Sequence, residues 1–199
     1  PPLPSDAREP LCSTDATDGE VTPWHRMSVM QLKILNTVAF IVTLIFNGIS
    51  STGLISKYGI GTVSRLYPTK ITPAGPAFSI WGIIYSLQGA FIVYQCCAWP
   101  AKDNAQFQHK LGIWFAATCL FNCLWIVVFV QGTVAAVWIS SVFLFGMLGC
   151  LLKLYLNCGL WTTPRHGWGD ENFAAHIVHM LLFDAQFSLY AGWVTVACI

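Results

Sequence analysis

Tryptophan is the residue through which this chain of 199 residues could bind a ligand, because it has nine indole rings and several of them fall inside long apolar runs. At a rise of about 1.5 Å per residue in helices of alternating direction, Trp81, Trp125, Trp138 and Trp193 are predicted to lie at one depth. That depth is roughly 6–10 Å from one end of the bundle on the same spacing. An aromatic-lined hollow with few polar groups is typical of a site for a flat hydrophobic ligand.

Polar side chains are predicted at or just below the same depth. Tyr85 and Asn122 each lie about one helical turn from a tryptophan, Tyr190 lies near Trp193, and Asn47 joins them from the first apolar run. The long segment 57–74 would lie above this layer and could cover it. Because depth does not distinguish rings that face inward from rings that face lipid, the alternative is a ring of packing aromatics that encloses nothing.

Titratable residues in the last apolar run form a second set of candidates. His176 and His179 are three residues apart and would share a helix face, as two ligands of a metal or a tetrapyrrole would. Two histidines give too few ligands, so no metal site is predicted. Asp184 lies near the middle of the same run, where an acid is a functional candidate. The alternative is a buried, neutral Asp184 that is hydrogen-bonded to another helix.

Covalent catalysis has no sequence signature here. We find no Gly-x-Ser-x-Gly elbow, no phosphate-binding loop and no cysteine with an obvious histidine base. Most of the eight cysteines fall inside apolar runs and are predicted to be packing residues. We therefore expect no catalytic residue, no required cofactor and no enzyme activity. The one enzymatic alternative, degradation of a tetrapyrrole, would need tryptophan or tyrosine redox chemistry that a sequence does not reveal.

The composition indicates the environment of these residues. Hydrophobic residues make up 55% of the chain and charged residues 10%, against about 25% charged in an average soluble protein. A multi-pass integral membrane protein is therefore expected. The formal net charge of +1 offers no basic patch for nucleic acid, so nucleic-acid binding is excluded.

Uncharged stretches indicate where the chain would cross the bilayer, since a crossing needs about 20 apolar residues. We predict an all-α integral membrane protein with five transmembrane helices in a domain that covers residues 27–199. The predicted helices are residues 30–55, 75–98, 111–130, 134–157 and 173–198. Residues 1–26 carry five acids and several prolines and are expected to form an extended or disordered acidic tail. Because the chain does not begin with methionine, an imported protein of an organellar membrane, plastid or mitochondrion, is suspected.

Three segments together resemble a known family. Gly75-Pro76-Ala77-Phe78-Ser79-Ile80-Trp81 continues to Tyr85 and Gly89, Leu120-Phe121-Asn122-Cys123-Leu124-Trp125 follows in the third predicted helix, and Phe187-Ser188-Leu189-Tyr190-Ala191-Gly192-Trp193-Val194-Thr195-Val196-Ala197 ends the fifth. These stretches resemble the motifs of the translocator protein / tryptophan-rich sensory protein (TspO/MBR) family.

The resemblance implies a five-helix bundle with a pocket beneath the loop that joins the first two helices, and a ligand such as a porphyrin or a sterol. It also implies pocket positions, which map onto Trp81, Tyr85, Asn122, Trp125, Trp193 and Ala197. Trp138 and Tyr190 are candidates from depth alone. A bound tetrapyrrole or lipid would be the ligand of such a pocket.

Two functions follow from these observations. The first is a receptor, sensor or carrier in a lipid membrane for a porphyrin-like or sterol-like small molecule. The alternative is an accessory transmembrane subunit of a larger photosynthetic or respiratory complex, in which the acidic tail would contact partners. A homodimer is compatible with either function.

Overall fold

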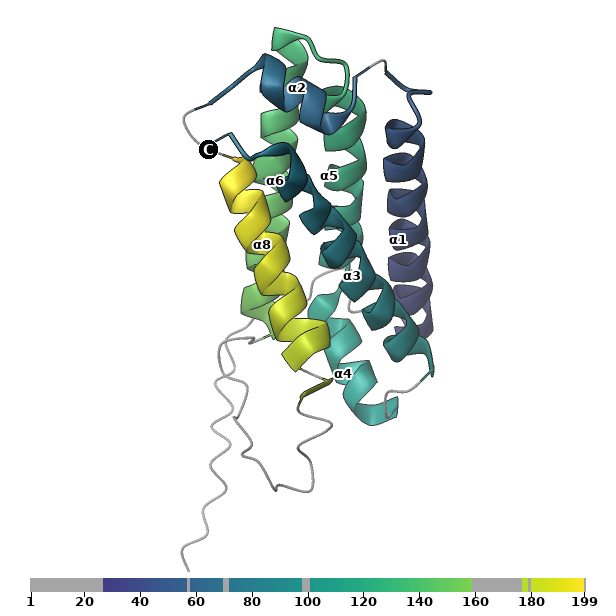
Figure 1. Ribbon diagram of the computed structural model, residues 1–199. Coiled ribbons are helices and arrows are strands. Elements are labelled where there is room, and N and C mark those ends of the chain that lie inside the picture. Colours follow the sequence, from purple (N-terminus) through teal and green to yellow (C-terminus); the bar gives the residue numbers. More distant parts are fainter. Residues whose placement is uncertain are drawn as a thin grey trace, which may run out of the picture.

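The computed structural model describes residues 27–56, 58–69, 72–97, 101–158, 177–178 and 180–198, without the side chains of 101–104 and 106. The predicted tail and the histidine pair at 176 and 179 lie outside the described residues. The described part is helical, and its long helices run alongside one another with both short helices at the ends (Figure 1).

The first long helix, α1 (Val29–Ser51), begins at a capping box. The Ser28 hydroxyl accepts a hydrogen bond from the Gln31 backbone N–H at 3.2 Å, and the Gln31 side chain accepts one from the Ser28 N–H at 2.8 Å. Both bonds satisfy backbone donors that a helix start leaves free. The helix ends before Gly53, whose φ of 81° suits glycine.

The next segment crosses one end of the bundle as α2 (Ile60–Leu66) and then re-enters it. Re-entry begins with the 3₁₀ segment η2 (Gly75–Ser79), where Pro76 occupies the first turn. Proline has no backbone N–H to lose there and its φ is already set for a helix. The chain then continues as α3 (Ile80–Cys97).

A short helix, α4 (Ala101–Leu111), lies at the opposite end of the bundle from α2. Most of this stretch lies outside the helices predicted from sequence, and the buried side chains of Phe107, Gln108 and Leu111 hold it against the core. The chain bends at Gly112, with a φ of 54°, and enters α5 (Trp114–Phe129). A turn at Gly132 leads to α6 (Val134–Cys158).

The last helix has two parts. A π-helical segment, η3 (Met180–Ala185), precedes α8 (Gln186–Ala197). Each of the five long helices packs against two others, in the closed order α1, α5, α6, α8 and α3. Such a ring encloses an interior along its whole length.

Four helical stretches are long and apolar enough to cross a membrane among the described residues: α1, η2 with α3, α6, and η3 with α8. The described part of the chain is all-helical, and it has the long apolar helices of a multi-pass membrane protein. The fifth helix, α5, is apolar but has 16 residues, or about 24 Å against a hydrocarbon core of about 30 Å. The count of five crossings remains a prediction.

Five phenylalanine rings fill the interior at the α4 end. Phe91 contacts Phe115 and Phe183 with centroids 5.7 and 5.4 Å apart, and Phe107 meets Phe183 at 4.6 Å, while Phe187 lies 6.3 Å from Phe91. All are buried and meet edge to face, the arrangement that aromatic pairs prefer. The α4 end is thus closed by packing, whereas the α2 end is hollow.

Candidate functional site

A cavity of about 160 Å³ lies inside the α2 end of the bundle. Its walls come from α2 and the segment after it, from η2 and α3, and from α5, α6 and α8. The lining residues are mostly apolar or aromatic, with several hydroxyls: Val63, Ser64, Tyr67, Thr69, Thr72, Pro73, Phe78, Trp81, Trp125, Phe129, Val137, Ser140, Ser141, Leu144, Trp193, Val196, Ala197 and Cys198.

Three indole rings form one side of the cavity. Trp81 of α3 lies 5.3 Å from Trp125 of α5 and 6.4 Å from Trp193 of α8, measured between ring centroids. Within its own helix, Trp125 stacks on Phe129 one turn later at 5.6 Å, since residues four apart share a helix face. Three helices thus bring their tryptophans together at a single point.

Two of the three indole nitrogens are hydrogen-bond donors without an acceptor among the described residues. The Nε1 atoms of Trp81 and Trp125 are buried and have no partner among the described residues. Leaving a buried donor unsatisfied costs about 1–3 kcal/mol, so such donors in a native protein call for an explanation. An acceptor on a bound molecule or a water would satisfy them.

Beneath the indoles lies a polar cluster that joins α1, α3 and α5. The Asn122 side-chain oxygen accepts hydrogen bonds from Asn47 Nδ2 at 2.8 Å and from the Tyr85 hydroxyl at 3.2 Å, and the ring of Tyr85 stacks on Trp81 at 5.5 Å. Tyr190 meets Trp81 edge to face at 5.9 Å and donates its hydroxyl to Met147 Sδ at 3.1 Å. These residues support the indoles and do not line the cavity.

The segment 52–74, which we call the lid, closes the cavity from above. The Ser56 hydroxyl donates to the Val130 carbonyl, and the Tyr67 hydroxyl donates to the Gly132 carbonyl at 2.9 Å. A Cβ on Gly132 would lie 2.9 Å from the ring of Tyr58, so the ring rests on the turn between α5 and α6 where only glycine fits. Val63 of α2 is fully buried under this arrangement.

Among the residues that the structure describes, none that lines the cavity is charged. Its polar groups are hydroxyls, and those of Ser140 and Ser141 both donate to the Val137 carbonyl, at 2.8 and 3.0 Å. Their lone pairs therefore remain available as acceptors. Arg65 of α2 is exposed and does not line the cavity. The site thus offers flat apolar surface with a few neutral donors and acceptors. Among the described residues, no group of three or more metal-ligating side chains is placed to hold an ion.

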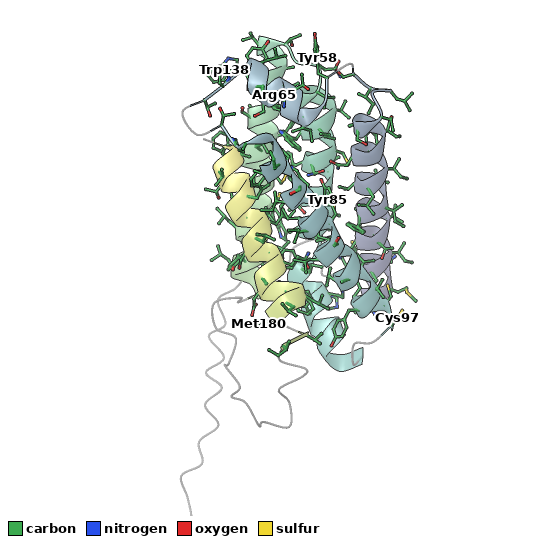
Figure 2. The ribbon with its side chains drawn as sticks, in the orientation of Figure 1. Tyr58, Arg65, Tyr85, Cys97, Trp138 and Met180 are labelled. Atoms are coloured by element: carbon green, nitrogen blue, oxygen red, sulfur yellow. The ribbon has the colours of Figure 1, made fainter. Side chains whose placement is uncertain are left out.

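The structure brings together most of the residues that sequence reasoning selected. Trp81, Trp125, Trp193 and Ala197 line the cavity. The three predicted residues Tyr85, Asn122 and Tyr190 lie next to them as the supporting cluster. Figure 2 shows Tyr85 in the interior of the bundle.

Two predicted residues lie elsewhere. The expectation that Trp138 belongs to the pocket layer is wrong, because its side chain is 74% exposed at the outer edge of the bundle (Figure 2). The inward face of α6 consists of Ala136, Ser140, Leu144, Met147, Cys150, Leu151 and Leu154. Asp184 lies half-buried in η3, which belongs to the other half of the last helix.

Sequence reasoning missed the residues that the lid and α6 contribute. Ser140 and Ser141 are adjacent hydroxyls in an otherwise apolar helix, and this could have marked them. For Tyr67, Thr69 and Thr72 no such signal exists, because the position of the lid depends on contacts with the distant turn at Gly132.

Comparison with known proteins agrees with the architecture. The family model described as TSPO-like protein matches residues 33–199, most of the chain. Neither the curated proteins nor the solved structures gave a match.

Proposed function

This chain belongs to the TSPO-like protein family, and from that premise we propose that its cavity binds a flat hydrophobic ligand of the tetrapyrrole or sterol class. The protein would act as a receptor, sensor or carrier for that ligand within the membrane. The observation that carries the proposal is the Trp81–Trp125 pair, with its rings 5.3 Å apart and both indole N–H groups buried without an acceptor in the described part of the chain.

The chemistry of the lining favours a tetrapyrrole over a sterol. A tetrapyrrole has an extended π system that can stack on or meet indole edges, and it has nitrogen and carbonyl groups that can accept from indole N–H. A sterol offers a single hydroxyl and no π surface. Because none of the described residues that line the cavity is charged, we expect acidic substituents of a tetrapyrrole to lie toward the lid and its exposed Arg65.

Binding of such a ligand requires the cavity to enlarge. Its volume of about 160 Å³ is below the range of about 300–1,000 Å³ that is usual for pockets of small-molecule ligands. The lid is the part that can move, since it is held by two side-chain hydrogen bonds to the α5–α6 turn, of about 0.5–1.5 kcal/mol each, and by the burial of Val63, worth about 1.5–3 kcal/mol. Entry would therefore displace the lid and leave the helices in place.

A titration in lipid nanodiscs tests the proposal. Protoporphyrin is added to the full chain and binding is followed by the shift of its absorption band. The Trp125→Phe variant is expected to bind about tenfold more weakly, since loss of an indole donor and part of its surface amounts to about 1.4 kcal/mol. The matched control is Trp138→Phe, which removes an exposed indole from the outer face and should bind as the parent does.

A second variant tests whether filling the cavity blocks binding, which is different from the loss of one contact. Ala197 lines the cavity, so Ala197→Trp would fill it and should abolish saturable binding while the helices remain folded. Cholesterol added as a competitor distinguishes the two ligand classes. Equal binding by the parent, Trp125→Phe and Ala197→Trp would contradict the proposal, and a role as an accessory subunit would then be the one to pursue.

A further inference from the structure

A second hollow lies at the other end of the bundle, between α1 and α3. This groove has a volume of about 400 Å³ and is lined by Met30, Lys33, Ile34, Thr37, Val38 and Cys96. Figure 2 labels the next residue, Cys97, at the end of α3 that is remote from α2. The groove shares no residue with the cavity, so its occupant is independent of the proposed function.

The wall that α1 contributes to the groove is an apolar track. Met30, Ile34 and Val38 are four residues apart and so lie in line on one helix face. Their side chains are 67%, 56% and 52% exposed, which in a membrane protein means contact with lipid. The Thr37 hydroxyl already donates a hydrogen bond to the Lys33 carbonyl at 2.8 Å, so it needs no further acceptor in the groove. The track fits a hydrocarbon chain.

One charge lies beside this track. Lys33 is half-buried and is the single charged residue among the described ones that line the groove. Among the residues that the structure describes, no carboxylate pairs with it, and the one acid whose side chain is described, Asp184, belongs to η3. An ammonium group at the edge of the hydrocarbon region is stabilised by an anion or by the headgroup zone.

We propose that the groove between α1 and α3 binds an anionic phospholipid. Its phosphate pairs with the Lys33 ammonium, and one acyl chain lies along Ile34 and Val38, with Met30 beside the headgroup. The arrangement complements such a molecule in both charge and polarity, because Lys33 stands near the start of α1 and Ile34 and Val38 continue from it toward the middle of the helix. A zwitterionic lipid would satisfy the track but would lack the net negative charge.

Native mass spectrometry of the full chain tests this assignment. The protein is released from nanodiscs that contain equal amounts of phosphatidylglycerol and phosphatidylcholine, and the retained lipids are counted. Phosphatidylglycerol should be enriched on the parent protein. Lys33→Gln should reduce that enrichment about fivefold, the effect of one basic residue near an anionic surface, and Lys33→Arg should retain it.

The matched control is Lys153→Gln, which removes an exposed lysine from α6 and should leave the enrichment unchanged. Val38→Trp keeps the charge but fills the track, and it should lower retention of both lipids. Far-ultraviolet circular dichroism of each variant reports folding. Equal enrichment in Lys33→Gln and the parent would overturn the proposal, and so would a hydroxylamine-sensitive acyl group on Cys96, since a covalently attached chain would then occupy the track.

Discussion

Replacement of Asn122 by leucine would remove the side-chain oxygen through which α5 accepts hydrogen bonds from α1 and α3. Its side-chain oxygen lies 2.8 Å from Asn47 Nδ2 and 3.2 Å from the Tyr85 hydroxyl. Asn47 would keep one hydrogen bond, because its amide also donates to the Thr43 carbonyl at 2.9 Å. Tyr85, in contrast, would lose the acceptor of its hydroxyl in a half-buried position. The change therefore affects the two donors unequally.

The size of the effect follows from this difference. A hydrogen bond between membrane helices contributes about 0.6 kcal/mol on average, which is the expected loss at Asn47. A buried donor without an acceptor costs about 1–3 kcal/mol, which is the expected loss at Tyr85. Asn122→Leu should therefore lower the free energy of unfolding by about 2–3 kcal/mol, taking the middle of these ranges.

Equilibrium unfolding by sodium dodecyl sulfate in mixed micelles, followed by circular dichroism, would measure this change. Tyr85→Phe supplies the second arm of a double-mutant cycle. By itself it should cost about 0.6 kcal/mol, whereas in the Asn122→Leu background it should cost nothing or restore some stability, because the orphaned hydroxyl is gone. If Tyr85→Phe costs the same in both backgrounds, the hydroxyl does not donate to Asn122 and the reasoning is refuted.

Three further predictions concern close packing and the lid. Gly132→Ala should lower the free energy of unfolding by about 1–3 kcal/mol, because φ is 65° and the new Cβ would lie 2.9 Å from the Tyr58 ring. Gly146→Ala should cost about 1–3 kcal/mol through overpacking, since its Cβ would lie 2.7 Å from Phe121 Cε1, and Phe121→Leu should recover most of that loss. Tyr67→Phe should speed amide hydrogen exchange in α2, because the lid loses its bond to the Gly132 carbonyl.

Gly149→Ala is the matched control for Gly146→Ala. This glycine is also in α6, but a Cβ there would meet nothing within 4 Å, and alanine is the better helix former by about 1 kcal/mol. The control should therefore be neutral or stabilising in the same unfolding assay. Equal losses for Gly149→Ala and Gly146→Ala would contradict the packing between α5 and α6, and unchanged exchange in Tyr67→Phe would contradict the anchoring of the lid.

The membrane-spanning helices could be predicted from sequence because charge is excluded from the hydrocarbon region. The uncharged runs give the ends of α1 and α6 to within a few residues. They do the same for Gly75–Cys97, the stretch that η2 and α3 form together. The stretch 101–111 could not be assigned in this way, because its helix depends on burial of Phe107, Gln108 and Leu111 against other helices.

The site was predictable where helical depth and helical direction agree. Trp81, Trp125 and Trp193 have the right depth and also point inward. Trp138 shows the limit, because depth says nothing about rotation, and two residues along the same helix Ser140 faces the interior. The segment 57–74 was expected to cover this layer, but its lining residues could not be named from sequence, since Tyr67 is placed by a hydrogen bond to a residue 65 positions away.

Photolabelling tests the central claim most directly. A porphyrin that carries a diazirine group would be irradiated with the protein in nanodiscs, with and without excess unmodified porphyrin, and the labelled peptides identified by mass spectrometry. The account predicts competed labels on residues that line the cavity, such as Tyr67, Trp81, Trp125, Ser141 and Trp193. Labels confined to the outer face around Trp138 or along α1, or labels that excess porphyrin does not compete, would contradict it.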